Sequence, residues 1–173
     1  LMTENTAQQE QFTGLILLTG TDKPGISASL FETLAPFAVH ILDIEQIVIN
    51  NRLILTVLIG ANPAHQNAIE EDLAACASAL DVDIATIFAK SAPTDVPKDL
   101  VEIHISSIKL HPRTVALVTK AVTETGANIE KFARKSTNPT SICMTVSGCA
   151  VEQISAALEN LPLEDATTTV NAL

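Results

Sequence analysis

The sequence predicts an α+β fold: two tandem ferredoxin-like domains, each with the strand and helix order βαββαβ. The first observation behind this prediction is an internal duplication at a constant spacing of 88 residues, with no gap needed between Pro24 and Gly60. The second is that strand-like and helix-like segments follow the same order in both copies. Because a βαββαβ unit forms a four-stranded antiparallel sheet with both helices on one face, we expect two such sheets. Three pairs illustrate the spacing: Leu15 with Ile103, Pro24 with Pro112, and Gly60 with Gly148.

Hydrophobic periodicity defines the elements of the first copy. Continuous or alternating aliphatic runs predict strands, and apolar residues spaced three and four apart predict helices. The two middle strands are joined by Asn50-Asn51, a pair that suits a tight hairpin turn. In chain order, we predict strand 15–18, helix 26–37, strands 39–49 and 53–59, helix 69–80 and strand 82–88.

The second copy repeats this order. Ile103 and Ile105 alternate with Glu102 and His104, which predicts a half-exposed strand, and Gly126 is placed to end the helix that follows. Asn138-Pro139 joins the middle strands. In chain order, we predict strand 101–105, helix 115–122, strands 127–134 and 141–146, helix 151–161 and strand 164–170.

The copies set the expected domain boundaries. We predict a disordered tail at 1–13, a first domain at 14–90, a linker at 91–99 that contains Pro93 and Pro97, and a second domain at 100–173. Domains of this type commonly pair through outer strands or helix-free faces, so we also expect a homodimer.

Composition and charge exclude several partners. The formal charge is −10 and the chain has five Phe but no Trp or Tyr. Nucleic-acid binding depends on basic patches and aromatic stacking, so we expect no nucleic acid, and an acidic chain is also unsuited to a membrane surface. The N-terminus is polar and the number of cysteines, three, is odd. We therefore expect a cytoplasmic protein without disulfides.

The turn between the first strand and the first helix predicts a ligand site. Gly25 lets a ligand reach the backbone without a Cβ in the way, and free N–H groups near the helix start can bind a carboxylate. Asp22 can accept hydrogen bonds from an α-ammonium group. The alternative is that Asp22 only caps the helix or forms the turn. The predicted site residues are Asp22, Lys23, Pro24, Gly25, Ile26 and Ser27.

Three segments of the first copy carry a family resemblance: Asp22-Lys-Pro-Gly-Ile26, Leu30-Phe-Glu-Thr-Leu34 and Leu42-Asp-Ile-Glu-Gln-Ile-Val48. They resemble the first ACT domain of actinobacterial phosphoserine phosphatases, and the second copy resembles the second ACT domain of those enzymes. The resemblance covers residues 14–171. ACT domains are small amino-acid-sensing modules with this fold. In the resembled enzymes, a catalytic domain of the haloacid-dehalogenase type follows the tandem.

The resemblance implies a function. The chain would be the regulatory and dimerisation region of a phosphoserine phosphatase, and residues 21–27 would sense an amino acid, most simply L-serine. The parent enzyme would hydrolyse L-phosphoserine to L-serine with magnesium, whereas this chain would carry no catalytic residue, metal or cofactor. One alternative is a free-standing tandem ACT regulator that resembles the accessory protein of glycine-cleavage gene repression. Another is a dimerisation module without a ligand.

The second copy departs from the pattern at the same turn. His111-Pro112-Arg113 stands where the first copy has Lys23-Pro24-Gly25, so a bulky cation replaces the glycine. We predict that this second turn no longer binds a ligand through its backbone, or that it contacts a ligand held by the other domain. Asn128 is a further ligand candidate, because ACT ligands often lie between a loop and a neighbouring strand. The alternative is that Asn128 only starts a strand.

Other chemical motifs are weak. Asp81-Val-Asp83 superficially resembles a phosphatase nucleophile motif, but it follows a helix instead of a strand, so we interpret it as a helix-to-strand turn. No histidine pair has metal-ligand spacing, and no cysteine lies near a histidine in sequence. We therefore predict surface roles for the four histidines and no metal site. The two phases of strand 141–146 leave it open whether Cys143 faces the core.

Overall fold

The computed structural model describes residues 10–92, 97 and 99–173. The chain divides into two units, Leu1–Thr94 and Asp95–Leu173. Each unit contains one antiparallel four-stranded sheet with its helices on one face, so the predicted fold class is confirmed.

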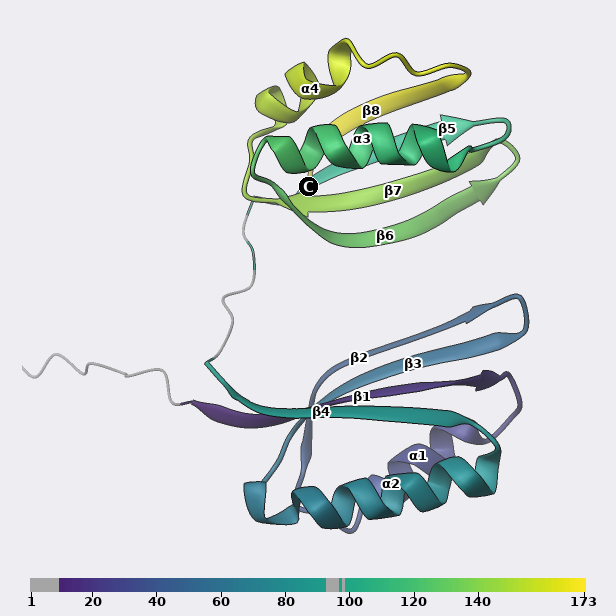
Figure 1. Cartoon of the computed structure of the whole chain (residues 1–173), viewed down its shortest axis with the longest axis vertical. Helices are drawn as coiled ribbons and strands as arrows, with labels where there is room; N and C mark the ends of the chain where they lie inside the picture. The colour runs from purple at the N-terminus through teal and green to yellow at the C-terminus, as the bar shows by residue number, and fades with distance from the viewer. Residues whose placement is uncertain (1–9, 93–96, 98) are drawn as a thin grey trace, which may run out of the picture. The chain divides into compact units, whose positions relative to one another are not determined.

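The first unit has the strand order β2-β3-β1-β4 (Figure 1). Helices α1 and α2 cover the same face of this sheet, and a short 3₁₀ turn, η1, precedes α2. The elements are β1 Gln11–Thr21, α1 Ile26–Leu34, β2 His40–Ile49, β3 Arg52–Gly60, η1 Pro63–His65, α2 Gln66–Leu80 and β4 Asp83–Ser91.

The second unit repeats this arrangement with the order β6-β7-β5-β8. The outer strands β6 and β8 are therefore equivalent to β2 and β4. Its elements are β5 Val101–Ser107, α3 Pro112–Glu124, β6 Asn128–Thr137, β7 Thr140–Ser147, α4 Val151–Glu159 and β8 Ala166–Ala172.

Each hydrophobic core lies between a sheet and its two helices. Along β1, Ile16 and Leu18 are fully buried while Leu15 and Leu17 are half-buried, because successive side chains of a strand point to opposite faces. In the second unit, the core contains the odd-numbered aliphatic residues of β5 together with Met144 and Val146 of β7. Within each unit, none of the described helices covers the other face of the sheet (Figure 1).

The strand register corrects one part of the predicted alignment. The constant spacing placed Leu15 on Ile103, yet Ile16 is the residue that shares the core position of Ile103. Leu18 lies opposite Leu55, and Ile105 lies opposite Ile142, so the inner strands match at a spacing one residue shorter. A slip of one residue exchanges the two faces of a strand, so this difference changes which side chains are buried.

The two hairpins also differ in length: eight residues lie between Gln46 and its partner Leu55, and seven lie between Arg134 and its partner Ile142. The β6–β7 pairing shifts between Arg134 and Ser136, which has no counterpart in β2–β3. Because the second hairpin is one residue shorter, Gly60 lies opposite His40, whereas Ser147, not Gly148, lies opposite Asn128. The prediction that no gap separates the copies between Pro24 and Gly60 is therefore wrong.

The start of the first domain also differs from the sequence prediction. Strand β1 begins at Gln11, so residues 11–13 belong to the sheet and not to a disordered tail. Stacking of Phe12 on Phe88, with ring centroids 5.8 Å apart, holds this end of β1 against β4. Residues 1–9 and most of the predicted linker (93–96 and 98) lie outside the described residues.

The hairpin turn that joins β2 to β3 is the one predicted from sequence. Asn50 and Asn51 have φ values of 48° and 63°. Two successive residues with positive φ define the type I′ geometry that matches the twist of a two-residue hairpin, and asparagine tolerates it. In the described part of the chain, every helix is too short or too polar to cross a lipid bilayer.

Replacing Leu30 by alanine tests the core assignment. Leu30 of α1 is fully buried, so we expect Leu30→Ala to lower the free energy of unfolding by about 2–5 kcal/mol. Ile87→Ala on β4 is the matched control, because Ile87 is 61% exposed. We expect it to lower the free energy of unfolding by less than about 1 kcal/mol. Urea denaturation followed by circular dichroism measures both, and equal losses would contradict the assignment.

Candidate functional site

The predicted ligand loop joins β1 to α1 and is exposed from Asp22 to Gly25. The backbone N–H of Asp22 donates a hydrogen bond of 2.9 Å to the carbonyl of Asn51, which ties the loop to the β2–β3 turn. Within the described residues, no hydrogen bond or ion pair engages the Asp22 carboxylate. That carboxylate therefore points to solvent beside the start of a helix and is not its cap.

Gly25 is the residue that precedes helix α1. Its φ is 93°, in the left-handed region, and α1 has no side-chain cap. Pro24 and Gly25 form the turn before the helix, and α1 begins at Ile26, as predicted. An added Cβ at Gly25 would meet no atom within 4 Å, so the requirement for glycine is conformational and not steric.

The backbone N–H groups at the start of α1 are available to a ligand. The N–H of Ser29 donates to the carbonyl of Gly25 at 3.0 Å and closes the first turn. The N–H groups of residues 26–28 precede that bond, as in any helix that lacks a cap. Together with the helix dipole, these donors can bind an anionic group such as a carboxylate.

Ser27 and Gln46 form a contact that the sequence did not predict. The Ser27 hydroxyl donates a hydrogen bond to Oε1 of Gln46 in β2, at 2.5 Å. It links the start of α1 to the outer strand of the sheet. Gln46 lies in the segment 42–48 that carried the family resemblance, but its spacing from Ser27 gave no signal of contact. The predicted site residue Ser27 is thus held in place through its side chain.

The second unit builds the same helix start differently. His111 precedes α3 with extended backbone, φ −89° and ψ 141°, and its Nδ1 accepts a hydrogen bond of 3.0 Å from the N–H of Arg113. An internal side chain therefore occupies a donor that the first unit leaves open. Sequence reasoning had attributed the loss of the site to the bulk of Arg113, and the structure adds this competing cap.

A surface hollow of about 540 Å³ lies beside this second loop. Charged groups of both signs line it, including Lys109 and Arg113 from the loop and Glu164 and Asp165 from the segment before β8. Its mixed charge gives no preference for an anion.

Asn128 is the first residue of β6, as predicted, but its side chain is engaged within the unit. Its Nδ2 donates to Oε1 of Glu130 at 2.7 Å, and the Ser147 hydroxyl donates to the same oxygen at 2.5 Å. The hydrogen bond from Ser147, and then that from Asn128, lowers the pKa of the Glu130 carboxyl. Asn128 belongs to the second unit and the Asp22–Ser27 loop to the first, so the fold of a single unit does not bring them together.

The Asp81-Val-Asp83 segment is a helix-to-strand turn, as predicted. Asp81 is the left-handed C-cap of α2, with φ 54°, and Asp83 begins β4. Both side chains are exposed.

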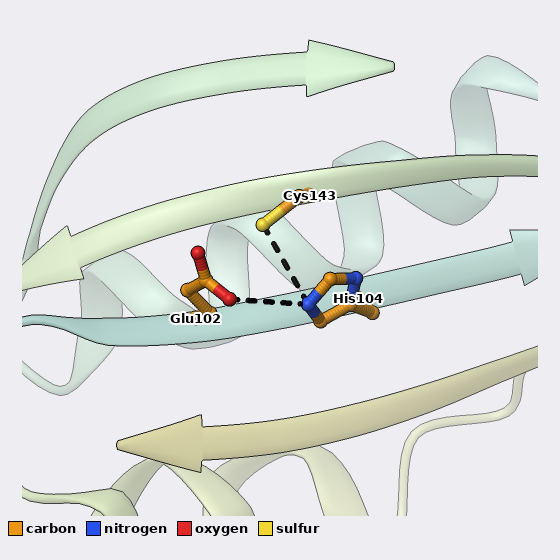
Figure 2. A network of polar contacts seen from close by, with 3 residues as sticks. All are labelled: Glu102, His104 and Cys143. Atoms are coloured by element: carbon orange, nitrogen blue, oxygen red, sulfur yellow. Dashed lines mark hydrogen bonds and ion pairs between the residues drawn. The ribbon is translucent and has the colours of Figure 1, made fainter. Parts of the chain in front are cut away.

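A polar cluster on the second sheet was not predicted. His104 Nε2 lies 3.3 Å from Oε2 of Glu102 and 3.8 Å from Sγ of Cys143 (Figure 2). Burial, and then the charge of Glu102, raises the pKa of the Cys143 thiol. The sequence signal was present in part, since Glu102 and His104 share a strand face, but Cys143 is 39 residues from His104 along the chain.

Sequence similarity decides the family of the first unit. Its residues match the profile of the ACT domain from 13 to 86. Residues 13–86 are an ACT domain. The second unit has the same ACT fold, and both results confirm the ACT resemblance inferred from segments 22–26, 30–34 and 42–48.

Two enzymes and one solved structure are similar to most of the chain. A phosphoserine phosphatase of Streptomyces coelicolor is 32% identical over 83% of the chain, and the phosphoserine phosphatase SerB2 of Mycobacterium tuberculosis is 31% identical over 67%. The chain spans 36% and 29% of these two relatives. The crystal structure of a candidate glycine cleavage system transcriptional repressor matches with a TM-score of 0.74 at 17% identity, over 94% of this chain and 98% of that one. This last match shows the shared fold.

The hydrogen bonds to Glu130 predict a pH-dependent signal at the start of β6. Since folding lowers the pKa of this carboxyl, its contribution to stability is present above the ordinary glutamate pKa and is lost as the pH falls through the lowered value. We expect Ser147→Ala and Asn128→Ala each to raise the Glu130 pKa, and Ser147→Ala to raise it more. Carboxyl chemical shifts measured by NMR during an acid titration test this order. The reverse order, or no change, would contradict the hydrogen-bond geometry.

Proposed function

We propose that the chain is the amino-acid-sensing region of a phosphoserine phosphatase and that its first ACT domain binds L-serine. The observation that carries the proposal is the similarity of 83% of the chain to the Streptomyces coelicolor enzyme. The whole protein would hydrolyse L-phosphoserine with magnesium, in a domain outside this chain, and would act in the cytoplasm. ACT domains as a class bind amino-acid effectors and often dimerise.

The geometry of the first loop supports an amino acid as the ligand. An α-carboxylate needs hydrogen-bond donors, which the start of α1 offers through residues 26–28. An α-ammonium group needs an acceptor, which the exposed Asp22 carboxylate offers a few residues earlier in the loop. Lys23 is exposed in the same loop and adds positive charge near the carboxylate.

The second loop supports an asymmetry between the domains. His111 caps the N–H of Arg113, so α3 has fewer open backbone donors at its start than α1 has. We therefore assign sensing to the first ACT domain and a supporting role to the second. Asn128 remains a proposed ligand residue through its Oδ1 and the second hydrogen of its Nδ2, because the first is donated to Glu130.

The second candidate function is a free-standing tandem ACT regulator. It is favoured by the end-to-end match in fold with the candidate glycine cleavage repressor, which covers 98% of that chain. Both candidate functions share amino-acid sensing, but a regulator would show it without phosphatase activity in the natural full-length protein. A phosphoserine hydrolysis assay on the natural full-length protein therefore separates the two.

Outer strand β2 supports a homodimer. Its side chains are exposed along the whole strand, and six of them are large and apolar: Ile41, Leu42, Ile44, Ile47, Val48 and Ile49. The equivalent outer strand β6 instead carries Lys131, Arg134 and Lys135. Lysine and arginine protect exposed strand edges from pairing, whereas a long apolar edge invites it. We therefore propose that two copies associate through β2.

A pair of glycine variants tests the sensing loop. Gly25 and Gly126 both have φ near 90°, at 93° and 89°, and an added Cβ would meet no atom within 4 Å at either. We expect Gly25→Ala and Gly126→Ala to cost about 1–2 kcal/mol of stability each, because both force an alanine into the left-handed region. Only Gly25→Ala should weaken L-serine binding, by about 10-fold or more, measured by isothermal titration calorimetry.

Two outcomes of that titration would count against the proposal. Equal L-serine affinity for both variants would show that the Asp22–Ser27 loop is only a turn. If L-serine, glycine and L-alanine give no heat at millimolar concentration, the chain does not sense an amino acid. The remaining interpretation is then a dimerisation module without a ligand. D-serine serves as the stereochemical control.

A charge on β2 tests the dimer. We expect Ile44→Lys to shift the chain to monomer, because lysine at an apolar edge opposes strand pairing. Ile87→Lys on β4 is the matched control, since Ile44 and Ile87 are 49% and 61% exposed on the two outer strands of one sheet. Sedimentation equilibrium measures the mass of each variant. If Ile44→Lys dimerises with unchanged affinity, β2 does not form the dimer interface.

A further inference from the structure

The polar cluster on the second sheet brings three kinds of metal-ligating atom together. Glu102 and His104 are two residues apart on β5 and therefore share one face of the sheet. Cys143 lies directly opposite His104 in the register of β5 with β7. Figure 2 shows the carboxylate and the thiol on the same side of the imidazole ring, both facing its Nε2.

The cluster lies on the face that carries no helix. Ile103 and Met144, the neighbours of the cluster along the two strands, are fully buried in the core between the sheet and its helices. Alternate residues must point the other way. Cys143 is nevertheless only 3% exposed, whereas the Glu102 and His104 side chains are 32% and 31% exposed. The thiol therefore forms the floor of the cluster, and the other two groups form its rim.

The distances fit a tetrahedral metal ion. Zinc binds nitrogen, oxygen and sulfur at about 2.0–2.3 Å, which places neighbouring tetrahedral ligands about 3.3–3.6 Å apart. The N–O separation is 3.3 Å and the N–S separation is 3.8 Å. All three ligand atoms lie within 4.8 Å of one another. The Glu102 side chain is partly exposed and therefore has room to turn its oxygen toward the sulfur.

The first ACT domain offers an internal comparison. At the equivalent places on its sheet stand Leu15 and Leu17 of β1 and Thr56, which lies opposite Leu17 on β3. The same fold thus tolerates an aliphatic pair at this position, so stability of the fold does not require the glutamate, histidine and cysteine of the second domain.

We propose that Glu102, His104 and Cys143 bind a divalent transition-metal ion, with Zn²⁺ the best fit to a mixed nitrogen, oxygen and sulfur ligand set. His104 would bind through Nε2, Glu102 through a carboxylate oxygen and Cys143 through Sγ, and water would complete the tetrahedron. The thiol releases its proton to solvent as the metal–sulfur bond forms. The two anionic ligands then balance the charge of the ion.

Cobalt spectroscopy on the full chain, in a form without an affinity tag, tests the site. Titration with Co²⁺ alone should give one equivalent of bound ion, with a thiolate-to-cobalt charge-transfer band in the near ultraviolet and the visible bands of tetrahedral cobalt. Zn²⁺ should displace it and abolish the bands. We expect Cys143→Ser to lose the charge-transfer band and His104→Ala to weaken binding by about 10-fold or more.

Controls separate the site from other cysteines and from a folding defect. Cys149→Ser should leave the spectrum unchanged, since Cys149 is a free, half-buried thiol outside the cluster. If Cys143→Ser fails to fold, Glu102→Gln and His104→Gln at the partly exposed rim decide, because either must weaken Co²⁺ binding. No thiolate band in the original chain, or an unchanged band in Cys143→Ser, would overturn the proposal. These readouts are independent of L-serine binding.

Discussion

The covering of each sheet on one face only is the constraint on which the rest of the structure depends. In a βαββαβ unit both helices pack on the same face, so alternate residues of every inner strand enter the core and the others do not. Ile16 and Leu18, like Ile103 and Ile105, supply the apolar burial that stabilises each unit. The residues between them point to the helix-free face and do not contribute to the core. In the first ACT domain they are half-buried leucines, and in the second they include Glu102 and His104.

The two helix starts show how one backbone problem receives two solutions. The first N–H groups of any helix lack partners within the helix and must be satisfied by a cap, by solvent or by a ligand. At α3 the His111 side chain provides the cap from an extended backbone. At α1 the left-handed Gly25 has no side chain, so the same donors stay open beside the Asp22 carboxylate. The first solution suits a structural helix end, and the second suits a reversible ligand.

The sequence was sufficient for the fold class, for the order of elements and for turns with local chemistry such as Asn50-Asn51. These depend on periodicity and on short-range backbone preference. It was insufficient where long-range register decides. The second hairpin is one residue shorter than the first beyond Arg134, and no local pattern marks this change of register. The same limit hid the contact of Ser27 with Gln46 and that of His104 with Cys143, since each pair meets only when strands or a helix pack together.

The divergence of the two domains is concentrated where the fold imposes least. Both cores are aliphatic, and exchange among aliphatic side chains of similar volume alters stability modestly. By contrast, the outer strands differ in kind, with apolar residues on β2 and cations on β6. The helix starts and the helix-free faces differ as well. A duplicated domain can acquire a new role at such positions because substitutions there do not disturb the packing of the core. The separate roles of the two ACT domains are therefore to be sought at Gly25, along β2 and around His104, and not in the buried residues that the copies share.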